Sequence, residues 1–167
     1  MDVKTTFLNG VIEEEVYIEQ PEGFETHEQK THVCRLKKAL YRLKQAPRAW
    51  YGQIENYLQN MGFVKSDADP NLYYLRVGDE PLILVLYVDD LFLNGSSRLI
   101  KDCKENLATE FEMKDLGRMQ YFLGLEVWQQ KGEIFLRQGR YTIEILKRFQ
   151  MEDCYPNDHK LEENRYV

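Results

Sequence analysis

Two adjacent carboxylates, Asp89 and Asp90, interrupt an apolar stretch that runs from Pro81 to Gly95. Residues 82–88 carry hydrocarbon side chains apart from one tyrosine, and the apolar run resumes at Leu91 before an Asn-Gly pair. Burial of an unpaired carboxylate costs several kcal/mol, and two neighbouring carboxylates also repel each other. The fold must therefore either expose this pair in a turn or neutralise its charge.

A hairpin whose turn is Val88-Asp89-Asp90-Leu91 would hold both carboxylates on rigid strands. Hard carboxylate oxygens are the ligands that Mg²⁺ prefers, so divalent cations would neutralise the pair. One aspartate pair rarely holds two metals, and we expect the third carboxylate from Asp2, which lies with Val3 at a strand end. Three carboxylates around two Mg²⁺ ions about 3.5–4 Å apart can activate a 3′-hydroxyl and stabilise a leaving pyrophosphate. The alternative is an ordinary exposed turn, where Asp is common.

Composition excludes several classes of protein. A chain of 167 residues with 43% hydrophobic content can bury one core, or a domain with an appendage. No segment reaches the roughly 18 apolar residues of a membrane span, and no leader opens the chain. The three cysteines are far apart, which is typical of reduced thiols. We therefore expect an intracellular, cytoplasmic protein that is not secreted. His27, His32 and Cys34 lack zinc-finger spacing, so no metal site is expected there.

The charged residues are segregated along the chain. The net charge of −6 argues weakly against a nucleic-acid binder, because such proteins usually carry a basic footprint. Residues 13–28 carry seven glutamates and no Lys or Arg, whereas residues 31–54 carry six Lys or Arg and no acid. The basic stripe could bind a phosphate backbone, and the solvated face of a helix explains it equally well.

Hydrophobic periodicity indicates mixed helices and strands. Helical spacing recurs over residues 36–43, is interrupted at Pro47, and returns over residues 50–61 and 99–111, the last helix capped by Ser96 or Ser97. Strands are expected at residues 72–75 and 82–88, and a further hairpin is expected to pair residues 121–127 with 134–136. A last helix is expected near residues 141–149. This order predicts an α+β fold in which helices cover an antiparallel sheet.

Several motifs in this chain resemble the reverse-transcriptase domain of copia-type retrotransposon polyproteins. MDVKTTFLNG resembles that family's first catalytic motif, VYIEQPEGFE the signature that follows, and LKKALYRLKQAPRAWY its template and nucleotide segment. ADPNLYY, LYVDD, FEMKDLG and YFLGLEV match in the same order, so the resemblance runs from Met1 to about Cys154. Several motifs in the right order are far more specific than any one of them.

The resemblance implies an RNA-directed DNA polymerase with a palm-like sheet. Residues 1–118 would form the palm subdomain, residues 119–151 the primer-grip hairpin and the start of a thumb, and residues 152–167 a divergent tail. The implied catalytic residues are Asp2, Asp89, Asp90 and Lys114, of which Lys114 could protonate the leaving pyrophosphate, although a surface lysine is a close alternative. Two Mg²⁺ ions, or Mn²⁺ in their place, would bind at Asp2, Val3, Asp89 and Asp90.

The resemblance also assigns binding roles. Phe7, five residues after Asp2, falls on the aromatic residue under the nucleotide sugar, and ordinary core packing is its alternative. Gln45 and Val3 would contact the incoming nucleotide. The residues that would contact nucleic acid are Arg42, Lys44 and Arg48 beside the template, and Phe122, Leu123 and Gly124 at the primer grip. The implied partners are an RNA template, a DNA primer, deoxynucleoside triphosphates and, in a virus-like particle, the polyprotein's integrase and RNase H.

Three departures from the family pattern affect the expected activity. The chain begins at the first catalytic motif, so we expect it to lack the fingers and their basic side chains. Arg42 in LYRLKQ stands where the family's LYGLKQ usually has glycine. Glycine readily adopts a positive φ, so the backbone conformation of Arg42 will show whether this turn requires one. The residues after Cys154 leave the pattern, and no RNase H region follows. A non-catalytic remnant with weak nucleic-acid affinity is therefore the alternative function.

We predict that the purified 167-residue chain does not extend a primer at a useful rate. Holding reactants in line can supply roughly 7–11 kcal/mol of a barrier, and the side chains expected to grip the triphosphate belong to the fingers. The measurement is primer extension on a poly-ribonucleotide template with Mg²⁺ or Mn²⁺, beside an Asp89→Asn control. Extension that vanishes in the control would contradict the prediction.

Overall fold

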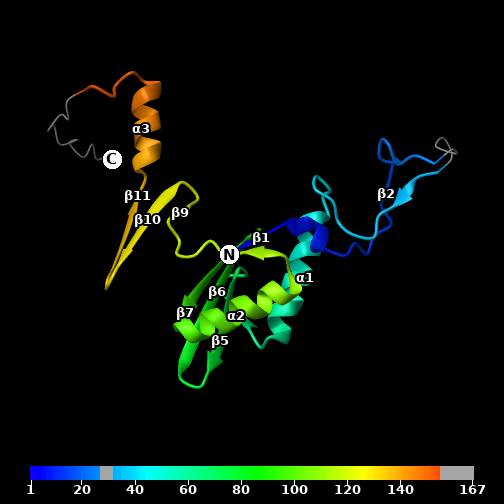
Figure 1. The fold of residues 1–167 in the computed structure, drawn as a ribbon, viewed down its shortest axis with the longest axis horizontal. Helices are drawn as coiled ribbons and strands as arrows, with labels where there is room; N and C mark the ends of the chain where they lie inside the picture. The colour runs from blue at the N-terminus through cyan, green and yellow to red at the C-terminus, as the bar shows by residue number, and fades with distance from the viewer. Residues whose placement is uncertain (27–31, 155–167) are drawn as a thin grey trace, which may run out of the picture. The chain divides into compact units, whose positions relative to one another are not determined.

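The computed structural model describes residues 1–26 and 32–154, and His27 and the tail from residue 155 lie outside them. The chain divides into two compact units, Met1–Gly117 and Arg118–Val167, beside the 118/119 boundary expected from the sequence. Each unit is an antiparallel sheet with helical segments (Figure 1), as expected for an α+β fold. The helices of the described residues fall short of the length and apolarity that a membrane span requires.

The first unit is built on a six-stranded sheet of order β4-β5-β6-β7-β1-β8, in which every neighbouring pair is antiparallel. The two central hairpin strands, β6 and β7, are joined by the short turn Val88–Asp89. The strands are β1 (Asp2–Val3), β4 (Val64–Lys65), β5 (Leu72–Val77), β6 (Glu80–Tyr87), β7 (Asp90–Gly95) and β8 (Met113–Lys114).

Helices α1 (Ala46–Asn60) and α2 (Ser97–Glu110) share one core with the sheet. Along β6 the even-numbered leucines are buried, while Ile83 and Tyr87 are exposed, as the two-residue period of a strand requires. The same core takes in one face of each helix. The helices therefore cover one face of the sheet, and the described residues of the first unit leave the other face open. Ser96 caps α2 by accepting a hydrogen bond from the Leu99 amide, which confirms the expected cap.

The helix expected over residues 36–43 is wrong. The short strand β3 (Cys34–Arg35) pairs with β2 (Tyr17–Ile18), and the chain then continues in bridges and turns. The Ala39 amide donates to Gly10 O, so this backbone is satisfied by the segment that follows the 3₁₀ helix η1 (Thr6–Asn9). Helix α1 begins only at Ala46, and Pro47 lies in its first turn, where a proline loses no hydrogen bond.

The described residues of the second unit, 118–154, form a three-stranded antiparallel sheet and one helix. Its elements are β9 (Tyr121–Phe122), β10 (Leu125–Gln130), β11 (Glu133–Arg137) and α3 (Gly139–Arg148). The turn at Lys131–Gly132 is as expected. The single strand expected over residues 121–127 is wrong, because Leu123 and Gly124 both have positive φ and make a tight turn that pairs Phe122 with Leu125.

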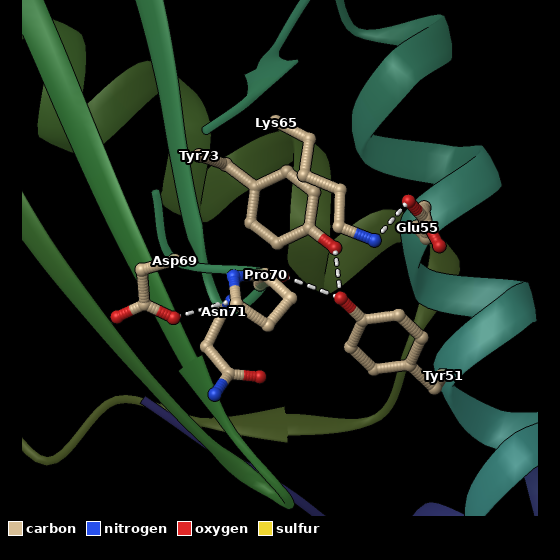
Figure 2. A network of polar contacts seen from close by, with 7 residues as sticks. All are labelled: Tyr51, Glu55, Lys65, Asp69, Pro70, Asn71 and Tyr73. Atoms are coloured by element: carbon tan, nitrogen blue, oxygen red, sulfur yellow. Dashed lines mark hydrogen bonds and ion pairs between the residues drawn. The ribbon is translucent and has the colours of Figure 1, made fainter. Parts of the chain in front are cut away.

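A polar network fastens the β4–β5 loop to α1 (Figure 2). Tyr73 is fully buried on β5, and its hydroxyl donates to the Tyr51 hydroxyl over 3.0 Å. Tyr51, on α1, donates in turn to Pro70 O, and Lys65 forms a 2.8 Å ion pair with Glu55 of the same helix. Burial raises the pKa of the Tyr73 hydroxyl most, and its hydrogen bond with Tyr51 raises that pKa further. The Tyr73 hydroxyl therefore keeps its proton and acts as the donor.

We predict that Tyr51→Phe lowers the free energy of unfolding by about 1–3 kcal/mol, because it leaves the buried Tyr73 hydroxyl without its acceptor. Removal of both hydroxyls in Tyr51→Phe/Tyr73→Phe should cost less than Tyr51→Phe alone. Tyr74→Phe, an exposed neighbour on β5, is the control and should change stability by no more than about 0.5 kcal/mol. Urea denaturation measures all four proteins, and equal losses in the single and double variants would contradict this account.

Candidate active site

The carboxylates predicted as catalytic meet where β1, β7 and the β6–β7 turn come together. Asp2 on β1 lies directly opposite Asp90 on β7. The Val3 amide donates to Asp89 O over 2.9 Å, and the Leu91 amide donates to Met1 O over 2.8 Å. Residues 86 to 90 positions apart in the sequence are thus fixed side by side by main-chain hydrogen bonds.

Charged and polar residues form a row across four neighbouring strands. Asp2 also pairs with Lys114 on β8, and Asp90 pairs with Tyr87 on β6. Directly opposed residues of antiparallel strands project to the same face. That face is the open one, because the neighbours Val3, Leu86 and Leu91 are buried in the core beneath the helices. We call Lys114, Asp2, Asp90 and Tyr87 the polar row.

The electrostatics of the row centre on Asp90. Burial raises the pKa of Asp90 above its ordinary value, and the charges of Asp89 and Asp2 raise it further. Asp90 is half-buried, whereas Asp89 is exposed in the turn. Like charges this close favour a proton or a cation between them. The donor chemistry therefore fits a hard divalent cation between Asp2 and Asp90.

The expected cluster of three carboxylates in coordination reach is not formed. Within residues 1–26 and 32–154, no three His, Cys, Asp or Glu side chains are arranged to hold a metal ion. Asp2 and Asp90 are cross-strand partners and share a face, whereas Asp89 lies exposed in the turn that precedes β7. The structure thus supplies two neighbouring carboxylates and a third beside them in the turn.

Phe7 lies in η1 and lines the same pocket as Val88 of the β6–β7 turn. The Phe7 ring packs edge-on against the Tyr41 ring, with 5.0 Å between the ring centroids. Phe7 also lines a pocket of about 170 Å³ together with Trp50 and Val88. Asn71 and Tyr51 form other parts of the wall, so the network of Figure 2 also shapes this pocket. Phe7 contacts the main core as well, which leaves both of its predicted roles open.

The basic residues predicted to lie beside the template are at the start of α1: Arg42 and Lys44 precede the helix, and Arg48 lies in its first turn. Arg42, Lys44 and Arg48 are exposed, and Gln45 is the half-buried residue immediately before the helix. Arg42 has φ 72°, so the turn does require the left-handed conformation that glycine adopts at little cost. The remaining predicted contacts, Phe122, Leu123 and Gly124, form the β9–β10 turn of the second unit.

Sequence reasoning assigned no site role to Trp50, whose indole N–H donates to Val88 O over 2.7 Å. The periodicity of residues 50–61 placed Trp50 only on the buried face of a helix. A buried indole N–H usually finds an acceptor, and this was the available signal. The identity of that acceptor depends on how α1 packs against the turn, which periodicity does not specify.

Comparison with known proteins gives a consistent result. The family model described as reverse transcriptase (RNA-dependent DNA polymerase) matches residues 1–162. The retrovirus-related Pol polyprotein from transposon TNT 1-94 of Nicotiana tabacum is 42% identical over 160 residues, covering 93% of this chain and 12% of that protein. The polyprotein from transposon RE1 of Arabidopsis thaliana is 40% identical over 157 residues, covering 93% of this chain and 11% of that protein.

A more distant relative comes from yeast. The transposon Ty1-DR4 Gag-Pol polyprotein of Saccharomyces cerevisiae is 31% identical over 146 residues, covering 80% of this chain and 8% of that protein. This chain therefore spans about a tenth of each of these polyproteins. No solved structure matches it.

We predict that Asp90→Asn raises the free energy of unfolding at neutral pH. The raised pKa means that the Asp90 carboxyl holds its proton more tightly in the folded state than in the unfolded state. The free energy of unfolding therefore falls as the pH rises from the ordinary carboxyl pKa through the raised pKa of the folded state. Asparagine removes this loss, and its advantage should disappear below the ordinary pKa of a carboxyl group. Urea denaturation between about pH 3 and pH 8 measures the difference.

Asp79→Asn is the matched control, because Asp79 lies in the turn at the opposite end of β6. It should change stability by no more than about 0.5 kcal/mol. An advantage of Asp90→Asn that is the same at every pH would show that charge is not its cause.

Proposed function

Because this chain belongs to the reverse transcriptase (RNA-dependent DNA polymerase) family, we propose that its first unit is the polymerase palm and that the polar row is its catalytic centre. The observation that carries the proposal is the register of β1 against β7, which sets Asp2 opposite Asp90 at the mouth of the hairpin turn. In this reading the reaction is RNA-templated DNA synthesis by nucleotidyl transfer to a primer 3′-hydroxyl.

The proposed metal ligands are Asp2 and Asp90, with Asp89 joining them from the turn and Val3 contributing its carbonyl. Two Mg²⁺ ions, or Mn²⁺, would activate the hydroxyl and stabilise the leaving pyrophosphate when bound there. Burial raises the pKa of Asp90 most, and the repulsion from Asp89 and Asp2 adds to it; a bound cation would relieve that repulsion. Lys114 is the proposed general acid, and its position opposite Asp2 supports that role.

The open face of the sheet is the proposed platform for the nucleic acid. Phe7 would lie under the sugar of the incoming deoxynucleoside triphosphate, since it lines the pocket next to Val88. Gln45 would contact the nucleotide, and Arg42, Lys44 and Arg48 would contact the template by charge. The β9–β10 turn, with Phe122, Leu123 and Gly124, would contact the primer, and α3 would begin a thumb.

The remaining proposals concern the cellular setting. We place the protein in the cytoplasm, in a virus-like particle of the element, with an RNA template, a DNA primer and the integrase and RNase H of a polyprotein as its partners. A non-catalytic remnant is the second candidate, favoured by the lack of a preformed cluster of three carboxylates among the described residues.

We predict that this chain supports reverse transcription inside a longer relative. A Pol polyprotein such as that of transposon TNT 1-94, first verified as active, would receive residues 1–162 of this chain, the range that the family model matches, in place of its own corresponding segment. DNA synthesis should persist in this chimaera and fall by at least about 10³-fold in Asp90→Asn, because removal of a carboxylate weakens charge stabilisation in the transition state.

Asp79→Asn in the same chimaera is the control and should leave synthesis unchanged. An inactive but well-folded chimaera would favour the remnant. Equal synthesis by the Asp90→Asn and Asp79→Asn chimaeras would exclude the polar row as the catalytic centre.

A further inference from the structure

The turn that carries the proposed catalytic aspartates has an unfavourable backbone conformation. Val88 and Asp89 form a two-residue loop between the paired residues Tyr87 and Asp90. Val88 has φ 55°, whereas the φ of Asp89 is not positive. Positive φ at only the first loop residue is the pattern of a type II′ turn, which normally has glycine there. A β-branched residue in this region is a genuine outlier, so neighbouring contacts must hold the turn.

Trp50 supplies one of these contacts from α1. Its indole N–H donates to Val88 O over 2.7 Å. The side chain is 2% exposed, and its ring packs edge-on against Phe111 at 5.3 Å. A Cβ atom at Gly10 would lie 2.8 Å from the Trp50 backbone nitrogen, so the helix is also closely packed at this residue. These packing contacts therefore fix the position of the indole N–H independently of its hydrogen bond to the turn.

The hydrogen bond to Val88 O selects one orientation of the Val88–Asp89 peptide group. Type I′ and type II′ turns differ by a flip of this peptide, and the flip would point the Val88 carbonyl away from its donor. The next carbonyl, Asp89 O, accepts from the Val3 amide on β1. Two hydrogen bonds thus hold the turn, one from Trp50 on α1 to Val88 O and one from the Val3 amide on β1 to Asp89 O.

We propose that Trp50 is a positioning residue for the polar row: its indole N–H holds the Val88–Asp89 peptide in the orientation that places Asp89 and Asp90 beside Asp2. The structural part of this inference stands on the observed hydrogen bond, and its importance for catalysis rests on the proposed function. A tryptophan that served only as core packing would stabilise the whole unit without acting on this peptide. The two roles are separable, because the N–H can be removed while an aromatic ring remains.

The test compares the full 167-residue chain with Trp50→Phe, both carrying Trp128→Phe so that Trp50 is the single tryptophan of the reference protein. Amide hydrogen exchange, followed by NMR without metal, is the readout. The Val3 amide reports the bond to Asp89 O, and the Ile100 amide, bonded to Ser96 O, reports a remote part of the same unit. Exchange at Val3 should accelerate on the order of tenfold, with little change at Ile100.

Val88→Gly provides the rescue. Glycine accepts positive φ without strain, so the turn should keep its conformation when the N–H is absent. In Trp50→Phe/Val88→Gly the exchange at Val3 should return to the rate of the reference protein. Replacement of Trp50 by benzothienylalanine, which keeps the size of the indole but lacks the N–H, should reproduce Trp50→Phe and serves if the phenylalanine variant unfolds.

Acceleration at Val3 and Ile100 together, without rescue by Val88→Gly, would show that Trp50 is core packing and overturn the inference. Unchanged exchange at Val3 in the benzothienylalanine protein would also overturn it. Mn²⁺ relaxation enhancement on the same proteins tests the proposed function separately. Binding in the reference protein that weakens in Trp50→Phe supports both proposals, whereas no binding in the reference protein counts against the metal site and leaves the exchange data to decide the role of Trp50.

Discussion

The pairing of β1 with β7 is the interaction on which the rest of the site depends. A strand of two residues sets Asp2 opposite Asp90, and the adjoining hydrogen bonds fix that register. A slip of one residue would turn Asp2 toward the core and Val3 toward solvent, because side chains alternate along a strand. The burial of Val3 therefore favours the register that exposes Asp2. Hydrophobic packing on one face of the sheet thus determines where charge appears on the other.

Much of the first unit could be predicted from the sequence because its signals are local. An apolar run at residues 82–88 marked β6, and a serine marked the beginning of α2. The aspartate pair was correctly predicted to lie at a hairpin, since apolar residues flank it on both sides, but the loop is Val88–Asp89, and Asp90 already pairs with Tyr87 instead of lying inside the expected turn Val88–Leu91.

The errors arose where backbone conformation or distant partners decide the structure. Residues 36–43 have helical spacing, but Arg42 adopts positive φ and the Ala39 amide bonds to Gly10. Leu123 likewise adopts positive φ in a turn that interrupts an apolar run. The expected three-carboxylate cluster is not found among the described residues, and its geometry depends on the turn that carries Asp89, which the adjacency of Asp89 and Asp90 in the sequence does not specify. The contact of Trp50 with Val88 needed the packing of a helix against a turn.

The shortness of β1 has a consequence for motion at the site. Asp89 and Asp90 belong to a long hairpin whose strands pair over many residues, whereas Asp2 is held by a two-residue strand between β7 and the equally short β8. Segments with few hydrogen bonds open at a small fraction of the global unfolding free energy. The first carboxylate can therefore leave the second by a local fluctuation that leaves the helices and the central hairpin intact. A ligand that bridges Asp2 and Asp90 would therefore also hold the amino-terminal strand in place.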